Sequence, residues 1–161
     1  MKSTGEVMGI DENFLSAYIK SQIACGNILP SNGNVFISID DGNKKSVITI
    51  AEKLKKLKFN LIATKGTAKL LNDRGIVTKQ VNKVKEGSPH IVDQLINNQI
   101  DLVINTTKSQ SSVRDSYSIR RTSLMHNIPY YTTIAGAKVA VDAIEHMKNN
   151  EFKIKSLQTI S

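Results

Sequence analysis

Short apolar segments alternate with amphipathic helical segments along this chain from residue 34 onward, and this alternation limits the fold more than any other feature. It predicts five strands, at residues 35–39, 59–63, 77–81, 101–105 and 128–132. Apolar residues recur at helical spacing between these strands and again over residues 135–147. Strands that alternate with helices form a parallel sheet covered on both faces. The expected fold class is therefore α/β, with a five-stranded parallel doubly wound sheet and flanking helices.

Turn and capping residues predict where several helices begin. Residues 64–67 are expected to form a loop, followed by a short helix over residues 68–74. Ser88 and Pro89 are expected to open the next helix, because serine caps a helix and proline is tolerated in its first turn.

The sequence also predicts the structure of two further segments. Ser112 is predicted to cap a helix that presents Val113, Tyr117 and Leu124 on one side. Residues 151–161 are expected to form a tail with a short strand.

The amino-terminal part of the chain is expected to be a separate unit. A helix is predicted over residues 11–25, and the Asn, Pro and Gly content of residues 27–34 is typical of a linker. The predicted division is therefore 1–33 for an arm or the end of a preceding unit, and 34–161 for the α/β domain.

Composition excludes several classes of protein. Cys25 is the single cysteine, so no intrachain disulfide is possible, and the three histidines are scattered, whereas metal sites need clustered ligands. No apolar run approaches the roughly 18 to 20 residues that span a bilayer, and the first residues have no apolar signal-peptide core. We expect a cytoplasmic protein with no metal site and no membrane partner.

The charge balance favours anionic partners. The 22 Lys and Arg residues exceed the 14 Asp and Glu residues, which gives a formal net charge of +8. Nucleic acid is one such partner and a small phosphorylated ligand is another. The aromatic residues are not interleaved with basic ones as in a single-strand stacking platform, so nucleic acid is the less favoured partner.

Polar residues gather where the predicted strands end, which is where doubly wound sheets bind their ligands. The residues after the strands are hydroxyl, amide, glycine and lysine types: Ser38, Lys44, Thr64, Lys65, Gly66, Thr67, Lys83, Asn105, Thr106, Thr107 and Thr132. Glycine lets backbone N–H groups approach phosphate oxygens, hydroxyls donate hydrogen bonds, and lysine adds charge. A phosphate site is therefore expected, although the 64–67 segment alone fits an ordinary turn with Thr67 as a helix cap.

The chain has no recognisable catalytic motif. It contains no Gly-x-Ser-x-Gly, no Walker A motif and no Gly-x-Gly-x-x-Gly. Asp40, Asp41 and Gly42 are most simply a turn, and Glu86 is predicted to end a loop. We therefore expect no catalytic residue in this chain.

Several motifs together resemble one family. They are residues 60–67, the run Asn82-Lys83-Val84-Lys85-Glu86-Gly87-Ser88-Pro89-His90, the run Asn105-Thr106-Thr107, the pair Arg120-Arg121, and Tyr131-Thr132-Thr133. In this order and spacing they resemble the C-terminal methylglyoxal-synthase-like regulatory domain of carbamoyl-phosphate synthase large subunits. Residues 1–9 look like the end of the preceding ATP-grasp unit, and the resemblance covers almost the whole chain.

The resemblance implies an allosteric domain of flavodoxin-like topology that binds a nucleotide effector, UMP or IMP. By this resemblance the phosphate and ribose would be held by Lys44, Thr64, Gly66, Thr67, Lys83, Asn105, Thr106 and Thr107, with Ser38 on the same rim, while Thr132 would contact ornithine at an interface with the neighbouring domain. The parent enzyme is a glutamine-hydrolysing ATP-dependent ligase of pyrimidine and arginine biosynthesis that uses Mg2+ or Mn2+. The resemblance implies no cofactor in this chain. Its implied partners are the rest of the large subunit, the glutaminase small subunit and further copies of the chain.

Two departures from the family bear on this reading. Methylglyoxal synthase itself has a catalytic aspartate in a Gly-Gly-Asp segment, whereas Glu86-Gly87-Ser88-Pro89 stands at the corresponding place here. Tyr131 stands where relatives can carry an acidic residue, which affects the ornithine contact. The alternative functions are a phosphate lyase of the methylglyoxal synthase type and a nucleic-acid-binding protein.

Overall fold

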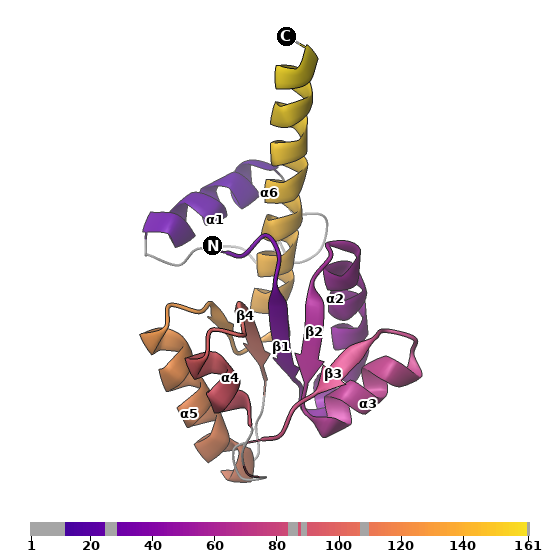
Figure 1. The fold of residues 1–161 in the computed structure, drawn as a ribbon, viewed down its shortest axis with the longest axis vertical. Helices are drawn as coiled ribbons and strands as arrows, with labels where there is room; N and C mark the ends of the chain where they lie inside the picture. Colours follow the sequence, from indigo (N-terminus) through magenta and orange to yellow (C-terminus); the bar gives the residue numbers. More distant parts are fainter. Residues whose placement is uncertain (1–11, 25–28, 84–86, 88–89, 107–109, 161) are drawn as a thin grey trace.

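Five parallel strands and the helices between them build the molecule (Figure 1). The computed structural model describes residues 12–24, 29–83, 87, 90–106 and 110–160. The strands are β1 Asn34–Ser38, β2 Asn60–Ala63, β3 Thr78–Gln80, β4 Leu102–Asn105 and β5 Tyr130–Tyr131. The helices are α1 Glu12–Ala24, α2 Lys44–Lys56, α3 Lys65–Asp73, α4 Ile91–Ile96, α5 Gln110–Met125 and α6 Ile134–Ile160, with a 3-10 turn, η2 Asp41–Asn43, before α2.

The strand order in the sheet is β3-β2-β1-β4-β5, and every neighbouring pair is parallel. The expected five-stranded parallel α/β fold is confirmed. The order 3-2-1-4-5 is that of a Rossmann sheet without its sixth strand, whereas a flavodoxin-like sheet has the order 2-1-3-4-5. The expectation of flavodoxin-like topology is therefore corrected in this detail, and the chain reverses direction across the sheet between β1 and β4.

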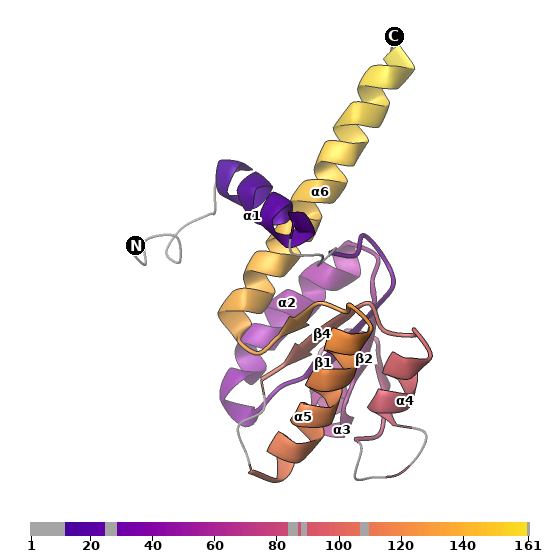
Figure 2. The ribbon, with the colours of Figure 1, turned by 90° about the vertical axis from the view of Figure 1, so that its left-hand side faces the viewer.

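Alternate residues of the strands bury against opposite layers of helices. Val35 and Ile37 of β1 share one core with α1, α2, α3 and α6, whereas Phe36 packs in a second core with α4 and α5. This period of two is the pattern of a strand buried on both faces. Figure 2, turned by 90°, shows α4 and α5 together and α2 with the lower part of α6 on another side of the sheet.

The predictions for two helices, α3 and α5, are corrected by the structure. Residues 65–67 form the first turn of α3 and not a loop. Ser112 lies inside α5, which begins at Gln110, and Tyr117 and Leu124 are exposed while Ile119 and Ser123 face the core. The side chain of Val113 and the pair Ser88 and Pro89 lie outside the described residues, and α4 begins at Ile91.

Helix α6 is much longer than predicted. It continues to Ile160, so the short strand expected within residues 151–161 is wrong. No glycine or proline interrupts the chain after Gly136, so nothing in the sequence forces the helix to end. Both views show its distal part projecting beyond the sheet (Figures 1 and 2).

Helix α1 packs against α6. Its Leu15 is 8% exposed and belongs to the same core as α6 and β1, as does Leu29 after the helix. Ser16 Oγ lies 3.2 Å from His146 Nε2 of α6, and Tyr18 Oη lies 3.0 Å from Tyr131 Oη at the end of β5. The predicted helix over residues 11–25 is thus present, and the division at residue 33 stays a prediction.

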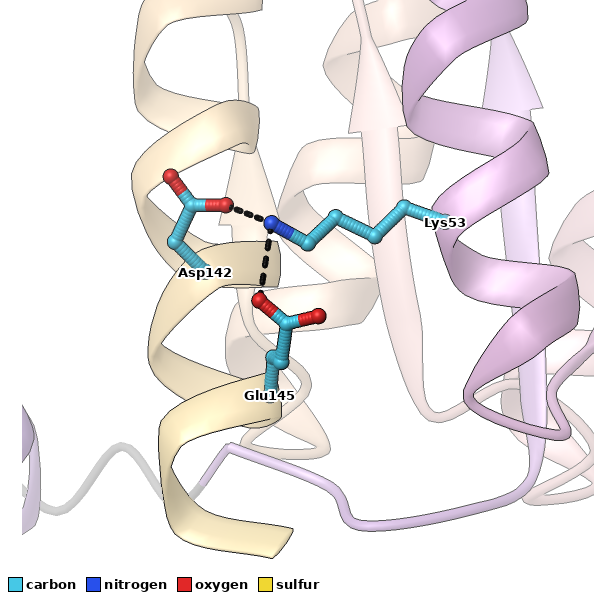
Figure 3. A network of polar contacts seen from close by, with 3 residues as sticks. All are labelled: Lys53, Asp142 and Glu145. Atoms are coloured by element: carbon cyan, nitrogen blue, oxygen red, sulfur yellow. Dashed lines mark hydrogen bonds and ion pairs between the residues drawn. The ribbon is translucent and has the colours of Figure 1, made fainter. Parts of the chain in front are cut away.

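An ion-pair cluster ties α2 to α6. Lys53 Nζ of α2 donates a hydrogen bond to Asp142 and lies 3.0 Å from Glu145 Oε1, both on α6 (Figure 3). The two carboxylates stand on one face of α6 because residues three apart are neighbours on a helix. None of the helices in the described part of the chain combines the length and apolar character that a membrane crossing requires.

Candidate anion-binding site

The candidate site lies where the chain reverses direction across the sheet. Ser38 ends β1 and Asn105 ends β4, and the two residues are register partners on neighbouring strands. The backbone N–H of Thr106 donates to Ser38 O at 3.0 Å, which joins the segments that follow the two strands. Doubly wound sheets bind ligands in the crevice outside the carboxyl ends of such strands.

Hydroxyl groups from three strand ends form a connected network here. Thr67 Oγ1 accepts a hydrogen bond from the Ile39 N–H at 3.3 Å, and Thr106 Oγ1 accepts from the Asp40 N–H at 3.4 Å. Thr64 Oγ1 donates to Ser38 Oγ at 3.5 Å. Among the described residues, the hydroxyl protons of Thr67, Thr106 and Ser38 have no acceptor, so each can donate to a ligand oxygen.

The start of α3 adds backbone donors to the site. Thr64 precedes the helix with extended backbone, but its side chain makes no capping hydrogen bond to the first turn. The first N–H groups of a helix have no intrahelical acceptor and carry a partial positive charge. A Cβ placed on Gly66 in this turn would meet no protein atom within 4 Å, so the space over its backbone is open.

Asn105 is held by two neighbours and buried to 3% exposure. Its Nδ2 donates to Ser116 Oγ at 3.1 Å and to Tyr130 Oη at 3.0 Å. Burial raises the pKa of Tyr130, against the opposing effects of the Asn105 hydrogen bond and the Arg120 charge, so the phenol stays neutral near pH 7. The Oδ1 atom of Asn105 is buried and has no hydrogen-bond partner within the described part of the chain.

Asp40 stands two residues beyond β1, beside Thr106. Its Oδ1 accepts a hydrogen bond from Asn43 Nδ2 at 2.8 Å, whereas its Oδ2 is buried and unpaired within the described residues. From sequence Asp40 was predicted to lie in a turn and was not among the predicted site residues. Its position at the carboxyl end of β1 was the signal that could have identified it.

The structure brings some of the predicted residues together and leaves others apart. The network joins Ser38, Thr64, Thr67 and Thr106, with Asn105 and Gly66 directly adjacent in the chain. Half-buried Lys44 begins α2, and half-buried Lys83 follows the single bridge that Asn82 makes with His90 beyond β3. Thr107 and Glu86 lie outside the described residues.

Thr132, predicted from the resemblance to contact ornithine, is exposed and follows β5. It lies beyond β4 from β1 and takes no part in the hydroxyl network. The neighbouring Tyr131 is half-buried, and burial followed by its hydrogen bond with Tyr18 raises the pKa of its phenol. The hydroxyls of Tyr18 and Tyr131 therefore pair with each other beside Thr132.

The chemistry of the site suits an anion that carries several oxygen acceptors. Hydroxyl protons, helix N–H groups and nearby lysines are the donors that phosphate sites use. Within the described residues, no group of three or more His, Cys, Asp or Glu side chains could hold a metal ion. Fold and site together define a small α/β domain with a candidate anion site at its topological switch point.

The chain belongs to the MGS-like domain family, whose model matches residues 46–132. This segment contains β2, β3 and β4, α3 and the site residues from Thr64 to Thr132. The resemblance stated from sequence is thereby confirmed at the level of the family.

Relatives that match along almost the whole chain include carbamoyl phosphate synthase large chains. The protein of Myxococcus xanthus is 49% identical over 98% of this chain. The "C-terminal section" proteins of Methanopyrus kandleri and Aquifex aeolicus are 48% and 44% identical over 99% and 100% of it. This chain spans only 15% of the Myxococcus protein and 30% of each of the other two.

A solved structure shares the fold. The crystal structure of methylglyoxal synthase from Elizabethkingia anophelis NUHP1 matches with a TM-score of 0.57, over 70% of this chain and 79% of that one. The two sequences are 24% identical in the match, so the likeness concerns the fold.

Proposed function

We propose that this chain acts as an effector-binding regulatory domain of a carbamoyl phosphate synthase large chain. The observation that carries the proposal is the donor-rich site at the ends of β1, β2 and β4. It lies in a chain that matches parts of such large chains along almost its whole length. The effector is a phosphorylated nucleotide, UMP or IMP, bound by the hydroxyl network, the start of α3, Lys44 and Lys83.

The remaining partners follow from the large chain to which the relatives belong. Thr132 contacts ornithine at an interface completed by another domain. The rest of the large chain, the glutaminase small subunit and further copies of the chain are the protein partners. ATP and Mg2+ or Mn2+ serve the synthetase part of the enzyme, in pyrimidine and arginine biosynthesis.

Regulation requires more than binding. An effector shifts the activity of an enzyme only when it binds two states of that enzyme with different free energies. The isolated chain can therefore retain binding while it has no synthetase to regulate, and the direct test of the site is a binding measurement.

The test is a calorimetric titration of the 161-residue chain with UMP and with IMP. We expect saturable binding of at least one nucleotide, and a loss of about tenfold or more in affinity for Lys83→Ala, since hydrogen bonds to charged groups are worth about 1.5 to 3 kcal/mol. Lys79→Ala is the matched control, because it removes the same charge from an exposed position on β3. It should change the affinity by less than about twofold.

Two results would contradict the proposal. Failure of both nucleotides to bind the wild-type chain would remove the nucleotide effector. Formation of methylglyoxal from dihydroxyacetone phosphate by this chain would instead make it a phosphate lyase.

A further inference from the structure

We propose that the two tyrosines of β5 couple the candidate anion site to the docking of α1, so that a ligand in the site strengthens the attachment of that helix. The link runs from Asn105 through Tyr130 and Tyr131 to Tyr18 of α1. It rests on the proposed function, because it concerns what occupancy of the same site changes elsewhere in the chain. Neither Tyr18 nor Tyr130 was among the site residues predicted from sequence.

Strand β5 is two residues long and presents one tyrosine to each face of the sheet. Tyr130 packs with the core that α4 and α5 cover, whereas Tyr131 packs with the core that includes α1 and α6. This is the arrangement expected of neighbouring residues in a strand, whose side chains point to opposite faces. A movement of β5 therefore displaces both side chains together, although they lie in different cores.

On one face of the sheet, the hydroxyl of Tyr130 holds the amide of Asn105. Asn105 Nδ2 donates to Tyr130 Oη at 3.0 Å and to Ser116 Oγ at 3.1 Å. Asn105 ends β4, is the register partner of Ser38, and precedes Thr106 of the hydroxyl network. A ligand that binds this network therefore favours the arrangement in which the end of β4, and with it Tyr130, is fixed.

On the other face, the hydroxyl of Tyr131 pairs with that of Tyr18, 3.0 Å away. The Tyr131 ring also lies close to the first turn of α6, where a Cβ on Gly136 would stand 3.4 Å from its Cδ1 atom. The glycine thus leaves room for the ring beside the helix. Tyr131 therefore lies against α6 while its hydroxyl reaches α1.

Both ends of the link are weakly held, so a single hydrogen bond can affect them. Strand β5 lies at the edge of the described sheet, where β4 is its neighbour. Among the side chains of α1 that the structure describes, Leu15 alone is buried, and Tyr18 and Ile19 are partly so. Elements with few buried apolar contacts open locally at a low free energy.

Hydrogen exchange of the α1 amides in the full chain, with and without UMP or IMP, tests the coupling. A saturating nucleotide should slow this exchange about twofold to tenfold, since the link transmits no more free energy than one hydrogen bond contributes. Without ligand, Tyr130→Phe should speed the exchange by a factor in the same range, although Tyr130 packs in the other core. Tyr117→Phe, which removes an exposed hydroxyl from α5, is the matched control and should change nothing.

Calorimetric titration of Tyr18→Phe gives the reciprocal measurement, because coupling between two sites acts equally in both directions. This variant keeps the ring and removes the hydroxyl that pairs with Tyr131. It should weaken nucleotide binding about twofold to tenfold, whereas a purely structural role for Tyr18 would speed exchange of α1 and leave the affinity unchanged. Ser16→Ala, which loosens α1 at its contact with His146 instead, should leave the affinity unchanged while α1 remains docked.

Three results overturn the coupling alone, in a wild type that binds a nucleotide. They are exchange of α1 that the nucleotide does not slow, exchange that Tyr130→Phe leaves as in the wild type, and a nucleotide affinity that Tyr18→Phe lowers no more than Ser16→Ala does. A wild type that binds neither UMP nor IMP overturns the proposed function and the coupling together.

Discussion

Gly66 is the residue at which protein stability and ligand binding should respond in opposite directions. It lies in the first turn of α3, and a Cβ there would meet no protein atom within 4 Å. Alanine is favoured over glycine in a helix by roughly 0.5 to 1 kcal/mol. We expect Gly66→Ala to raise the free energy of unfolding by up to this amount, and to weaken binding of the phosphate ligand because the methyl group occupies its approach.

Urea unfolding and calorimetric titration of the same preparation measure the two effects of Gly66→Ala. The unfolding curve is the control for the fold, so a loss of binding in a protein of unchanged or higher stability reports on the site itself. Unchanged affinity would mean that the ligand does not approach the backbone of α3.

The positions of the site residues could be predicted from sequence, but their pairing could not. Ser38, Thr64, Thr67, Asn105 and Thr106 were expected at strand ends, and the structure places them at one edge because parallel strands end together. Asp40, in contrast, was predicted only to lie in a turn. Whether its Oδ2 is paired depends on where Asn43 and Thr106 lie in space, and no local pattern records that.

At the scale of elements, the strands were easier to predict than the helix faces. All five predicted strands are present within a few residues. The three central strands β1, β2 and β4 are short, mostly apolar and buried, as parallel strands covered on both faces are. The sequence predicted that α5 carries Tyr117 and Leu124 on one side, but both side chains are exposed. The core instead contains Ser123, which is tolerated because its Oγ donates to Ile119 O at 2.7 Å and so remains satisfied when buried.

The contact between α2 and α6 depends on Lys53. We expect Lys53→Met to lower the free energy of unfolding by on the order of 1 kcal/mol, since it removes the ammonium that lies between Asp142 and Glu145 and leaves two like charges on one face of α6. Lys69→Met is the matched control: its ion pair with Asp73 is exposed and lies within α3, so its loss should cost less than about 0.5 kcal/mol. Equal effects of the two variants would show that the α2–α6 ion pair contributes no more to stability than the exposed ion pair within α3.

The same cluster predicts a pH dependence. Burial acts to lower the pKa of Lys53, but hydrogen bonds to Asp142 and Glu145 and their charges outweigh it, so the pKa lies above the ordinary 10.5. A raised lysine pKa stabilises the folded state fully below the unfolded value and loses that contribution as pH rises through the folded pKa. Unfolding measured above about pH 10.5 should therefore show a steeper loss of stability in the wild type than in Lys53→Met.

At the scale of the whole molecule, the question is whether α1 is an arm or part of the domain. Sequence predicted a separate unit over residues 1–33, because residues 27–34 have the composition of a linker. Linker composition describes the local backbone and does not record what the preceding helix packs against. Leu15 and Leu29 nonetheless lie in the same core as β1 and α6.

Leu15→Ala distinguishes the two arrangements. If α1 folds with the sheet, removing a side chain that is 8% exposed should lower the free energy of unfolding by about 2 to 4 kcal/mol, as other buried leucines do, with one cooperative transition. Phe14→Ala, in the same helix, removes a ring that is 50% exposed and stacked on Tyr18, and should cost less. If Leu15→Ala leaves the main transition unchanged, α1 detaches independently. The link from Tyr18 to Tyr131 at the end of β5 could then form or break without unfolding the site.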